Sequence, residues 1–199
     1  MDIKLFSKNN VGSVATLFLV ILLKPIIYDS WRHFLFLTVL LIIISIYGLY
    51  FISLSKIKWL RLTLFLLITL NIVSTIFTMK YLHPYEYVYY NSTVGGLKGA
   101  FHQYETDYWG ESYKEAVVWF NKNINNPDQN YLIKTEGDPY SSTPYFMKNM
   151  TLVDDQNKAD YVFTFTRWNL DQAYSGKIIY QVVRYGIPLV IIKEGNGGR

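Results

Sequence analysis

Residues Leu62–Met79 read LTLFLLITLNIVSTIFTM, a run of 18 residues without a charged side chain. A helix needs about 20 apolar residues to cross a bilayer core about 30 Å thick. A second charge-free run, Phe34–Leu54, extends over 21 residues, and Val11–Tyr28 is a weaker apolar segment that Lys24 and Pro25 interrupt near its end. The sequence therefore predicts a membrane α-helical region, 1–82, with three transmembrane helices at about 11–28, 34–54 and 62–79.

The first of these segments has an alternative reading as a cleaved signal peptide. A signal peptide ends at a small-residue cleavage site, whereas Lys24-Pro25-Ile26-Ile27 follows this apolar stretch. We therefore expect a retained membrane span.

Charge is distributed unevenly between the two halves of the chain. Residues 1–82 carry eight Lys/Arg against two acids, a balance of +6, and residues 83–199 carry eleven against thirteen, a balance of −2. Lys56, Lys58 and Arg61 link the second and third predicted spans without an acid, which predicts a cytoplasmic link. We expect a multi-pass protein of the plasma (inner) membrane whose part after Lys80 is extracytoplasmic. The basic excess flanks the spans, so nothing indicates a nucleic-acid partner.

The second half, 83–199, has the patterns of a small α/β domain. Ser112–Glu115 has the sequence of a capping box, and apolar residues then recur at helical spacing up to Ile124. A Thr143-Pro144 start predicts a short helix to about Asn149. Strands are predicted at 131–135, 161–166, 177–184 and 187–193, the last two joined as a hairpin at Tyr185-Gly186, with Pro188 on an edge.

Metal and cofactor chemistry receives no support from the sequence. The chain contains no cysteine, and its three histidines (His33, His83 and His102) lie in separate segments without ligand spacing. We therefore predict no metal site, and no cofactor is identified.

One polar cluster follows the first predicted span, at the outer membrane surface. It contains Asp29, Trp31, Arg32 and His33. An arginine fork suits a phosphate and a histidine adds a second donor, so Arg32 and His33 are the candidates for binding a lipid phosphate. Asp29 and Trp31 are candidates for binding substrate. The alternative is a loop in which Arg32 pairs with Asp29 and Trp31 belongs to the interfacial aromatic belt.

Two further segments combine aromatic and polar side chains. His83 begins a tyrosine-rich stretch that either stacks on sugars or anchors the chain at the interface. Glu105, Asp107, Tyr108 and Trp109 place carboxylates beside aromatic rings, a mixture that suits carbohydrate. The alternative for this second segment is a structural turn in which the tryptophan packs under the following helix.

Four stretches together resemble a known family. They are Tyr28–Phe36 (YDSWRHFLF), His83–Asn91 (HPYEYVYYN) with Gly95-Gly96 after it, Glu105–Ala116 (ETDYWGESYKEA) and Tyr185–Lys193 (YGIPLVIIK). In combination they are similar to the C-terminal part of GT-C-type glycosyltransferases. These are multispanning membrane enzymes related to protein O-mannosyltransferases and to lipid A aminoarabinose transferase.

The resemblance implies transfer of a sugar from a polyprenyl-phosphate-linked donor to an acceptor outside the cytoplasm. Such enzymes have many more spans, and their catalytic acid lies in the first outer loop, for which no residue here is a match. The catalytic residues are therefore unassigned, and a missing N-terminal catalytic half becomes an expected partner. The alternatives are a non-enzymatic, membrane-anchored module that binds a glycan or a partner, and an inactive remnant.

The predicted topology can be tested with single cysteines, because the natural chain has none. We expect a cysteine at Ser141 to react with a membrane-impermeant thiol reagent in intact cells and a cysteine at Ser55 to be protected, since the Lys56–Arg61 cluster holds Ser55 inside. Labelling after lysis controls for access, and labelling of position 55 alone would contradict the topology.

Overall fold

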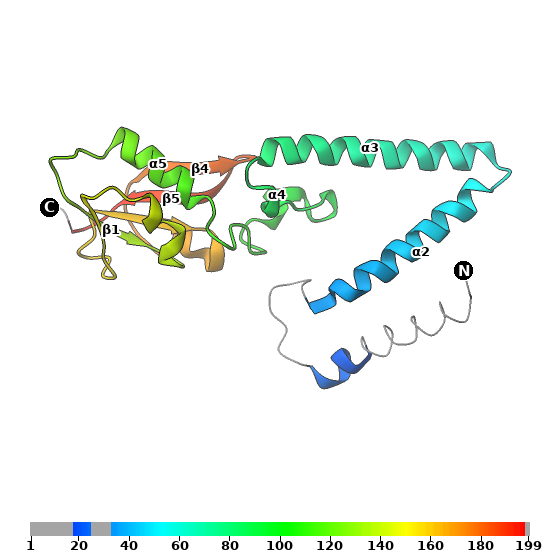
Figure 1. Ribbon diagram of the computed structural model, residues 1–199, viewed down its shortest axis with the longest axis horizontal. Coiled ribbons are helices and arrows are strands. Elements are labelled where there is room, and N and C mark those ends of the chain that lie inside the picture. Colours follow the sequence, from blue (N-terminus) through cyan, green and yellow to red (C-terminus); the bar gives the residue numbers. More distant parts are fainter. Residues whose placement is uncertain (1–17, 25–32, 198–199) are drawn as a thin grey trace. The chain divides into compact units, whose positions relative to one another are not determined.

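A computed structural model describes residues 18–24 and 33–197 of the chain (Figure 1). The chain divides into two compact units, Met1–Asn71 and Ile72–Arg199. The first unit contains helical residues 18–23, helix α2 (Leu35–Ser53) and the beginning of helix α3 (Lys58–Leu82). Helix α3 continues past Asn71 into the second unit.

Helix α3 is apolar over most of its length. At 25 residues it is about 37 Å long, and the predicted segment 62–79 lies inside it. None of its most apolar 18-residue window is buried against protein. Within the described ranges, 18–24 and 33–197, α3 is the one helix that is long and apolar enough to cross a membrane.

The predicted fold with three transmembrane helices is wrong for this reason. The apolar helical stretch in α2, Leu37–Ser53, is shorter and does not meet the same criterion of length and composition. In the segment predicted at 11–28, the described helix ends at Leu23, where Lys24 takes a φ of 43°. The helical conformation is sterically disfavoured for a residue that precedes a proline, which accounts for the end of the helix at this point. The rest of that segment lies outside the described residues.

The second unit contains a five-stranded mixed sheet in the order β2-β1-β3-β5-β4, so the predicted small α/β domain is confirmed. Strands β2, β1 and β3 run parallel, β5 runs antiparallel to β3, and β4 runs antiparallel to β5. The strands are β1 (Tyr131–Thr135), β2 (Met150–Leu152), β3 (Tyr161–Phe165), β4 (Ile178–Arg184) and β5 (Ile187–Glu194). Four of the five were predicted, and the three-residue β2 was not.

The β4–β5 hairpin forms as predicted, since Tyr185 and Gly186 take φ values of 50° and 77°. Strand β5 lies between β3 and β4, so the prediction that Pro188 lies on an edge strand is wrong. Pairing between β5 and β3 begins only at Val190, so Pro188 interrupts no pairing on that side. On the other side it faces Val183 next to a register shift.

Helix α5 (Tyr113–Asn123) packs against β4 and β5 and matches the predicted helix (Figure 1). Ser112 precedes it, but its side chain does not cap the helix, so the capping-box prediction is wrong. The hydroxyl instead donates to Asp107. The short helix predicted from Thr143 is a three-residue 3₁₀ turn, η5 (Thr143–Tyr145).

Besides η5, five short elements connect α3, α5 and the strands. Three precede α5: η2 (Glu86–Val88), η3 (Ser92–Val94) and α4 (Gly96–Ala100). The other two are η4 (Pro139–Ser141), after β1, and η6 (Arg167–Gln172), after β3.

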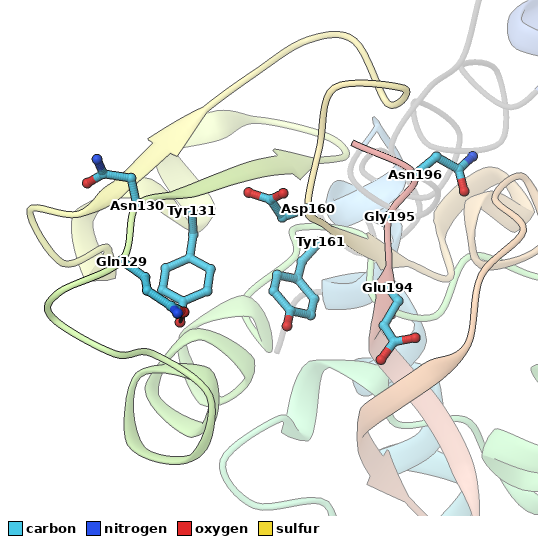
Figure 2. A pocket seen from close by; sticks show the side chains of 8 residues that line it. All are labelled: Gln129, Asn130, Tyr131, Asp160, Tyr161, Glu194, Gly195 and Asn196. Carbon is cyan, nitrogen blue, oxygen red and sulfur yellow. Dashed lines mark hydrogen bonds between the residues drawn. The ribbon is translucent and has the colours of Figure 1, made fainter. Parts of the chain in front are cut away.

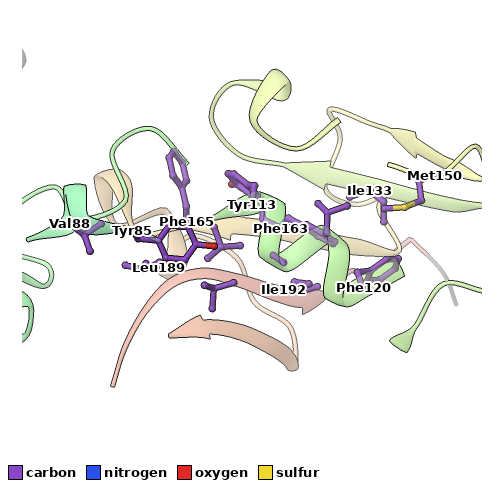
Figure 3. Packing of buried hydrophobic residues seen from close by; sticks show 14 of the residues in the cluster. Tyr85, Val88, Tyr113, Phe120, Ile133, Met150, Phe163, Phe165, Leu189 and Ile192 are labelled. Carbon is purple, nitrogen blue, oxygen red and sulfur yellow. The ribbon is translucent and has the colours of Figure 1, made fainter. Parts of the chain in front are cut away.

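The core lies between α5 and the sheet (Figure 3). Phe120 is fully buried and makes edge contacts with the rings of Tyr131, Tyr161 and Phe163, at centroid distances of 5.6, 4.9 and 5.4 Å. Leu82, the last residue of α3, belongs to the same buried cluster. The end of α3 is therefore part of the folded domain.

Replacing Phe120 with alanine should destabilise the domain by about 3–5 kcal/mol, because it leaves a cavity among three rings. The measurement is urea unfolding of the full chain in detergent. Val118→Ala is the matched control on the same helix, since Val118 is 52% exposed and should change the free energy of unfolding by less than about 0.5 kcal/mol. Equal losses in the two variants would contradict this packing.

Candidate functional site

The connections after β1 and β3 separate at the carboxyl edge of the parallel strands. After β1 the chain moves to β2 on one side of β1, and after β3 it continues to the antiparallel strands on the other side. Such a switch in direction opens a crevice at the carboxyl ends of the strands, which is where α/β sheets bind ligands. The side chains at this edge are therefore candidates for a ligand site.

The segment Glu105–Ser112, here called the 105–112 loop, lies at this edge of the sheet. The Thr106 hydroxyl lies 2.5 Å from that of Thr166, which directly follows β3, and the Asp107 amide donates to the same Thr166 oxygen at 3.4 Å. On the β1 side, the hydroxyl of Ser141 donates to the carbonyl of Trp109 at 3.2 Å. The loop thus bridges the connections that follow both strands.

Asp107 is the buried centre of the loop, with no exposed surface. Its carboxylate accepts hydrogen bonds from the hydroxyls of Tyr87 and Ser112, the latter at 2.5 Å. Burial raises the pKa of Asp107 from 3.8 to about 6, although the hydrogen bonds from Ser112, Tyr87 and the Gly110 amide oppose the rise. Burial and the charge of Asp107 also raise the pKa of Tyr87 far above its ordinary value, so Tyr87 keeps its proton and donates.

A cavity of about 310 Å³ opens beside the loop. It is lined by aromatic, carboxylate, imidazole and amide side chains from two segments: His102, Gln103, Tyr104, Glu105, Thr166, Trp168 and Asn169. Trp168 and Tyr104 are 64% and 55% exposed. Glu105 accepts the Trp168 amide hydrogen at 3.4 Å, which joins the two segments.

Backbone strain is concentrated around this cavity. His102, Trp168 and Asn169 take φ values of 59°, 53° and 58°, a left-handed conformation that is costly for residues with a side chain. Such strain persists where surrounding contacts over-determine the structure, and it is common at ligand sites.

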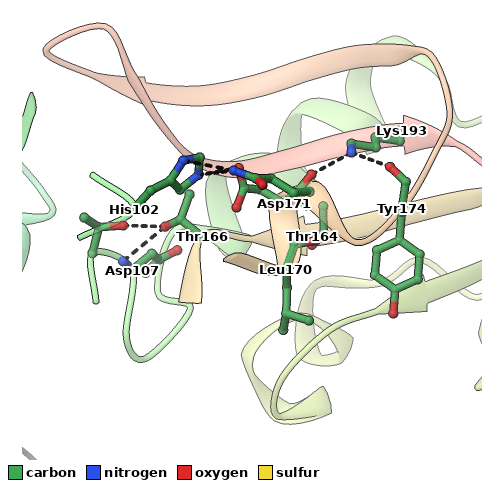
Figure 4. Close-up of polar contacts among 10 residues, drawn as sticks. His102, Asp107, Thr164, Thr166, Leu170, Asp171, Tyr174 and Lys193 are labelled. Atoms are coloured by element: carbon green, nitrogen blue, oxygen red, sulfur yellow. Dashed lines mark hydrogen bonds and ion pairs between the residues drawn. The ribbon is translucent and has the colours of Figure 1, made fainter. Parts of the chain in front are cut away.

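A polar network holds His102 in place (Figure 4). His102 Nε2 lies 2.9 Å from Asp171 Oδ2, and its Nδ1 lies 3.0 Å from the side-chain amide of Gln172. The buried Lys193 donates to the carbonyls of Asp171 and Tyr174, both at 2.6 Å. Both ring nitrogens of His102 are therefore engaged, which fixes the imidazole at the cavity wall.

Within the 105–112 loop, Tyr108 and Trp109 extend the site towards the protein surface. Their rings meet edge to face at 4.8 Å, and Trp109 is 60% exposed. The guanidinium of Arg167 stacks on Tyr108 at 3.7 Å and on Trp168 at 4.1 Å. An aromatic ridge thus runs from Trp168 through Arg167 and Tyr108 to Trp109.

The candidates predicted from the sequence are only partly brought together. Glu105, Asp107, Tyr108 and Trp109 belong to one site, although Asp107 faces inwards. His83 lies apart from that site, where it is exposed and pairs with Glu86 at 2.7 Å.

Of the four candidates predicted near the membrane, the structure describes only His33. Asp29, Trp31 and Arg32 lie outside the described residues. His33 is exposed in a short 3₁₀ turn of the first unit.

Several residues of the site were not predicted. They are Gln103, Tyr104, Thr166, Arg167, Trp168, Asn169, Asp171 and Gln172; His102 was considered only as a metal ligand, and Tyr87 only as part of the tyrosine-rich stretch after His83. The one available signal was Arg167-Trp168 directly after a predicted strand, at the edge where ligands bind.

A larger cavity, about 620 Å³, lies at the opposite end of the sheet, where β1 and β3 begin and β5 ends (Figure 2). Two of its polar side chains form hydrogen bonds within the fold. The carboxylate of Asp160 accepts the Leu132 amide at 2.8 Å, and the Tyr131 hydroxyl donates to the Ile124 carbonyl at 3.2 Å. For this reason we take the carboxyl-edge cavity as the candidate site.

Among residues 18–24 and 33–197, no three His, Cys, Asp or Glu side chains are grouped so that they could hold a metal ion. Comparisons with protein families, curated proteins and solved structures find no match to this chain.

The buried Asp107 predicts a specific pH dependence of stability. The folded protein binds the Asp107 proton more tightly than the unfolded chain, so stability falls as pH rises from about 4 to about 6. A shift from 3.8 to about 6 corresponds to about 3 kcal/mol. We expect the stability of the wild type, relative to Asp107→Asn, to fall by up to this amount between pH 4 and pH 7.

The measurement is urea unfolding at several pH values, comparing wild type with Asp107→Asn. Asp128→Asn is the control, because Asp128 is exposed and its loss should leave the wild-type pH profile intact. Parallel pH profiles for wild type and Asp107→Asn would show that the buried carboxyl does not titrate in this window.

Proposed function

We propose that this chain is a membrane-anchored saccharide-binding module of a glycosyltransferase that uses a polyprenyl-phosphate-linked sugar. In this proposal α3 is the membrane anchor, the domain after it is extracytoplasmic, and the carboxyl-edge cavity binds the sugar. The chain supplies binding, and a separate catalytic part supplies the acid or base for transfer.

The observation that carries the proposal is the lining of the carboxyl-edge cavity. Exposed aromatic faces, here Trp168 and Tyr104, cover the apolar C–H faces of a sugar ring. Glu105, Gln103 and Asn169 offer carboxylate and amide groups for the hydroxyls. A volume of about 310 Å³ is at the lower end of the range for small-molecule sites.

The choice of a glycosyltransferase has separate support. The stretches around Tyr28, His83, Glu105 and Tyr185 resemble the C-terminal part of GT-C-type enzymes, and Glu105–Ala116 includes the loop at the candidate site. Helix α3, with no buried residue in its most apolar window, suits attachment to a bilayer. The competing proposal, a glycan-binding module without an enzyme, shares the same cavity and differs in having no catalytic partner.

Binding can be tested with the full chain in an amine-oxide detergent, whose head group is neither a sugar nor a phosphate. Saturation-transfer NMR against glucose, mannose, galactose and N-acetylglucosamine should detect binding of at least one sugar. Trp168→Ala should weaken it by about tenfold or more, the usual effect of removing an aromatic hot spot. Tyr140→Ala is the control, because Tyr140 is 83% exposed and lies outside the cavity lining.

Two results would count against the proposal: no binding of any sugar by the wild type, or unchanged binding by Trp168→Ala. A second arm separates binding from catalysis. The chain alone, given polyprenyl-phosphate-linked sugars, should release no lipid phosphate above a no-protein control. Turnover that is lost in Asp29→Asn or Asp107→Asn would instead assign the catalytic base to this chain.

A further inference from the structure

Arg167 follows β3 directly and has an unusual environment for a charged side chain. Its guanidinium lies between the ring of Tyr108, at 3.7 Å, and the ring of Trp168, at 4.1 Å. Stacking on aromatic faces is favourable for the flat, weakly hydrated guanidinium and fixes its plane. The direction in which its N–H groups point is therefore set before any ligand arrives.

Most of the donors of Arg167 are unused. Nη1 donates to the Tyr108 carbonyl at 3.3 Å, and Nε is buried without a hydrogen-bond partner among the described residues. Nη2 has no partner in this part of the chain either, yet it is not among the buried unpaired atoms, so it is accessible to solvent. Arg167 also forms no ion pair with a described residue.

Arg184 shows what a purely structural stacked arginine looks like in the same domain. Its guanidinium lies over the ring of Tyr85 at 4.6 Å. All three of its nitrogens are used: Nε donates to the His83 carbonyl at 3.3 Å, Nη1 to the Val183 carbonyl at 2.9 Å and Nη2 to Glu115 at 2.9 Å. Stacking alone therefore does not account for the open donors of Arg167.

The neighbouring acids are already engaged with other groups. The carboxylate of Glu105 accepts the Trp168 amide, and the carboxylate of Asp107 is buried under the hydroxyls of Tyr87 and Ser112. On either side of Arg167 in the sequence, Thr166 and Trp168 line the candidate cavity. An oxyanion on a sugar held against Trp168 would be within the reach of the open guanidinium edge.

We infer that Arg167 makes this site selective for an anionic saccharide, by donating to its phosphate or carboxylate oxygens. The inference rests on the proposed saccharide-binding function and adds the class of ligand. A guanidinium presents paired N–H groups that match two oxygens of either oxyanion, and charge-assisted hydrogen bonds of this kind are the strong ones. Lysine keeps the charge but loses the flat, stacked geometry.

The test is isothermal titration calorimetry of the full chain in an amine-oxide detergent with four probes: glucose, glucose 1-phosphate, glucuronate and inorganic phosphate. At least one anionic sugar should bind the wild type about tenfold or more tightly than glucose, the gain expected from a charge-assisted hydrogen bond. The two anionic sugars distinguish a phosphate from a carboxylate ligand. Arg167→Lys and Arg167→Met should lose most of this preference while still binding glucose.

Arg184→Lys is the matched control, and it should keep the wild-type preference. Retained glucose binding by the Arg167 variants shows that the cavity is still folded. Equal affinities of the wild type for glucose and both anionic sugars, or an unchanged preference in Arg167→Lys, would overturn the inference and leave the saccharide site in place. Binding of inorganic phosphate without binding of any sugar would overturn both the inference and the proposed function.

Discussion

The buried carboxylate of Asp107 is the constraint on which the carboxyl edge of this domain depends. The carboxylate accepts hydrogen bonds from Tyr87, in the chain after α3, and from Ser112, at the start of α5, while the Asp107 amide donates to Thr166, directly after β3. Because a buried charge must be hydrogen-bonded, the Ser112 hydroxyl serves Asp107 and leaves helix α5 without a side-chain cap. The 105–112 loop is thereby held in place, and its Trp109 side chain remains exposed at the surface.

Much of the fold of the second unit could be predicted from local patterns. Strand and helix periodicity indicated α5 and four strands, because α5 and the central strands each place an apolar face against one core. Strand β2 has only three residues, too few to show a periodic pattern of apolar side chains. Predicted spans were less reliable: the run Phe34–Leu54 does contain helix α2, but among the described residues only α3 is long and apolar enough to cross a membrane. The end of the helix at Lys24 depends on the backbone φ angle of that residue, which cannot be predicted from composition.

The candidate site likewise combines residues that are close together in the sequence with residues that are far apart in it. Glu105, Asp107, Tyr108 and Trp109 could be predicted because acids and aromatic rings adjoin in the sequence. Their partners, Thr166 to Asn169, are about sixty residues away, and only the folded sheet brings them to the same edge. Nor could the sequence pattern distinguish the buried Asp107 from the exposed Glu105, because burial of a carboxylate depends on which hydroxyl groups the fold brings next to it.

The two edges of the sheet have a consequence for self-association. One edge is β2, which has only three residues, and the other is β4, whose ladder has register shifts at Ile178/Tyr180 and Val182/Val183. Short strands and bulges prevent a second chain from adding a long run of backbone hydrogen bonds. The exposed side chain of Lys177, directly before β4, adds positive charge at this edge, which opposes alignment of like edges. A chain so rich in tyrosine and β-branched residues is thus protected, once folded, against edge-to-edge aggregation.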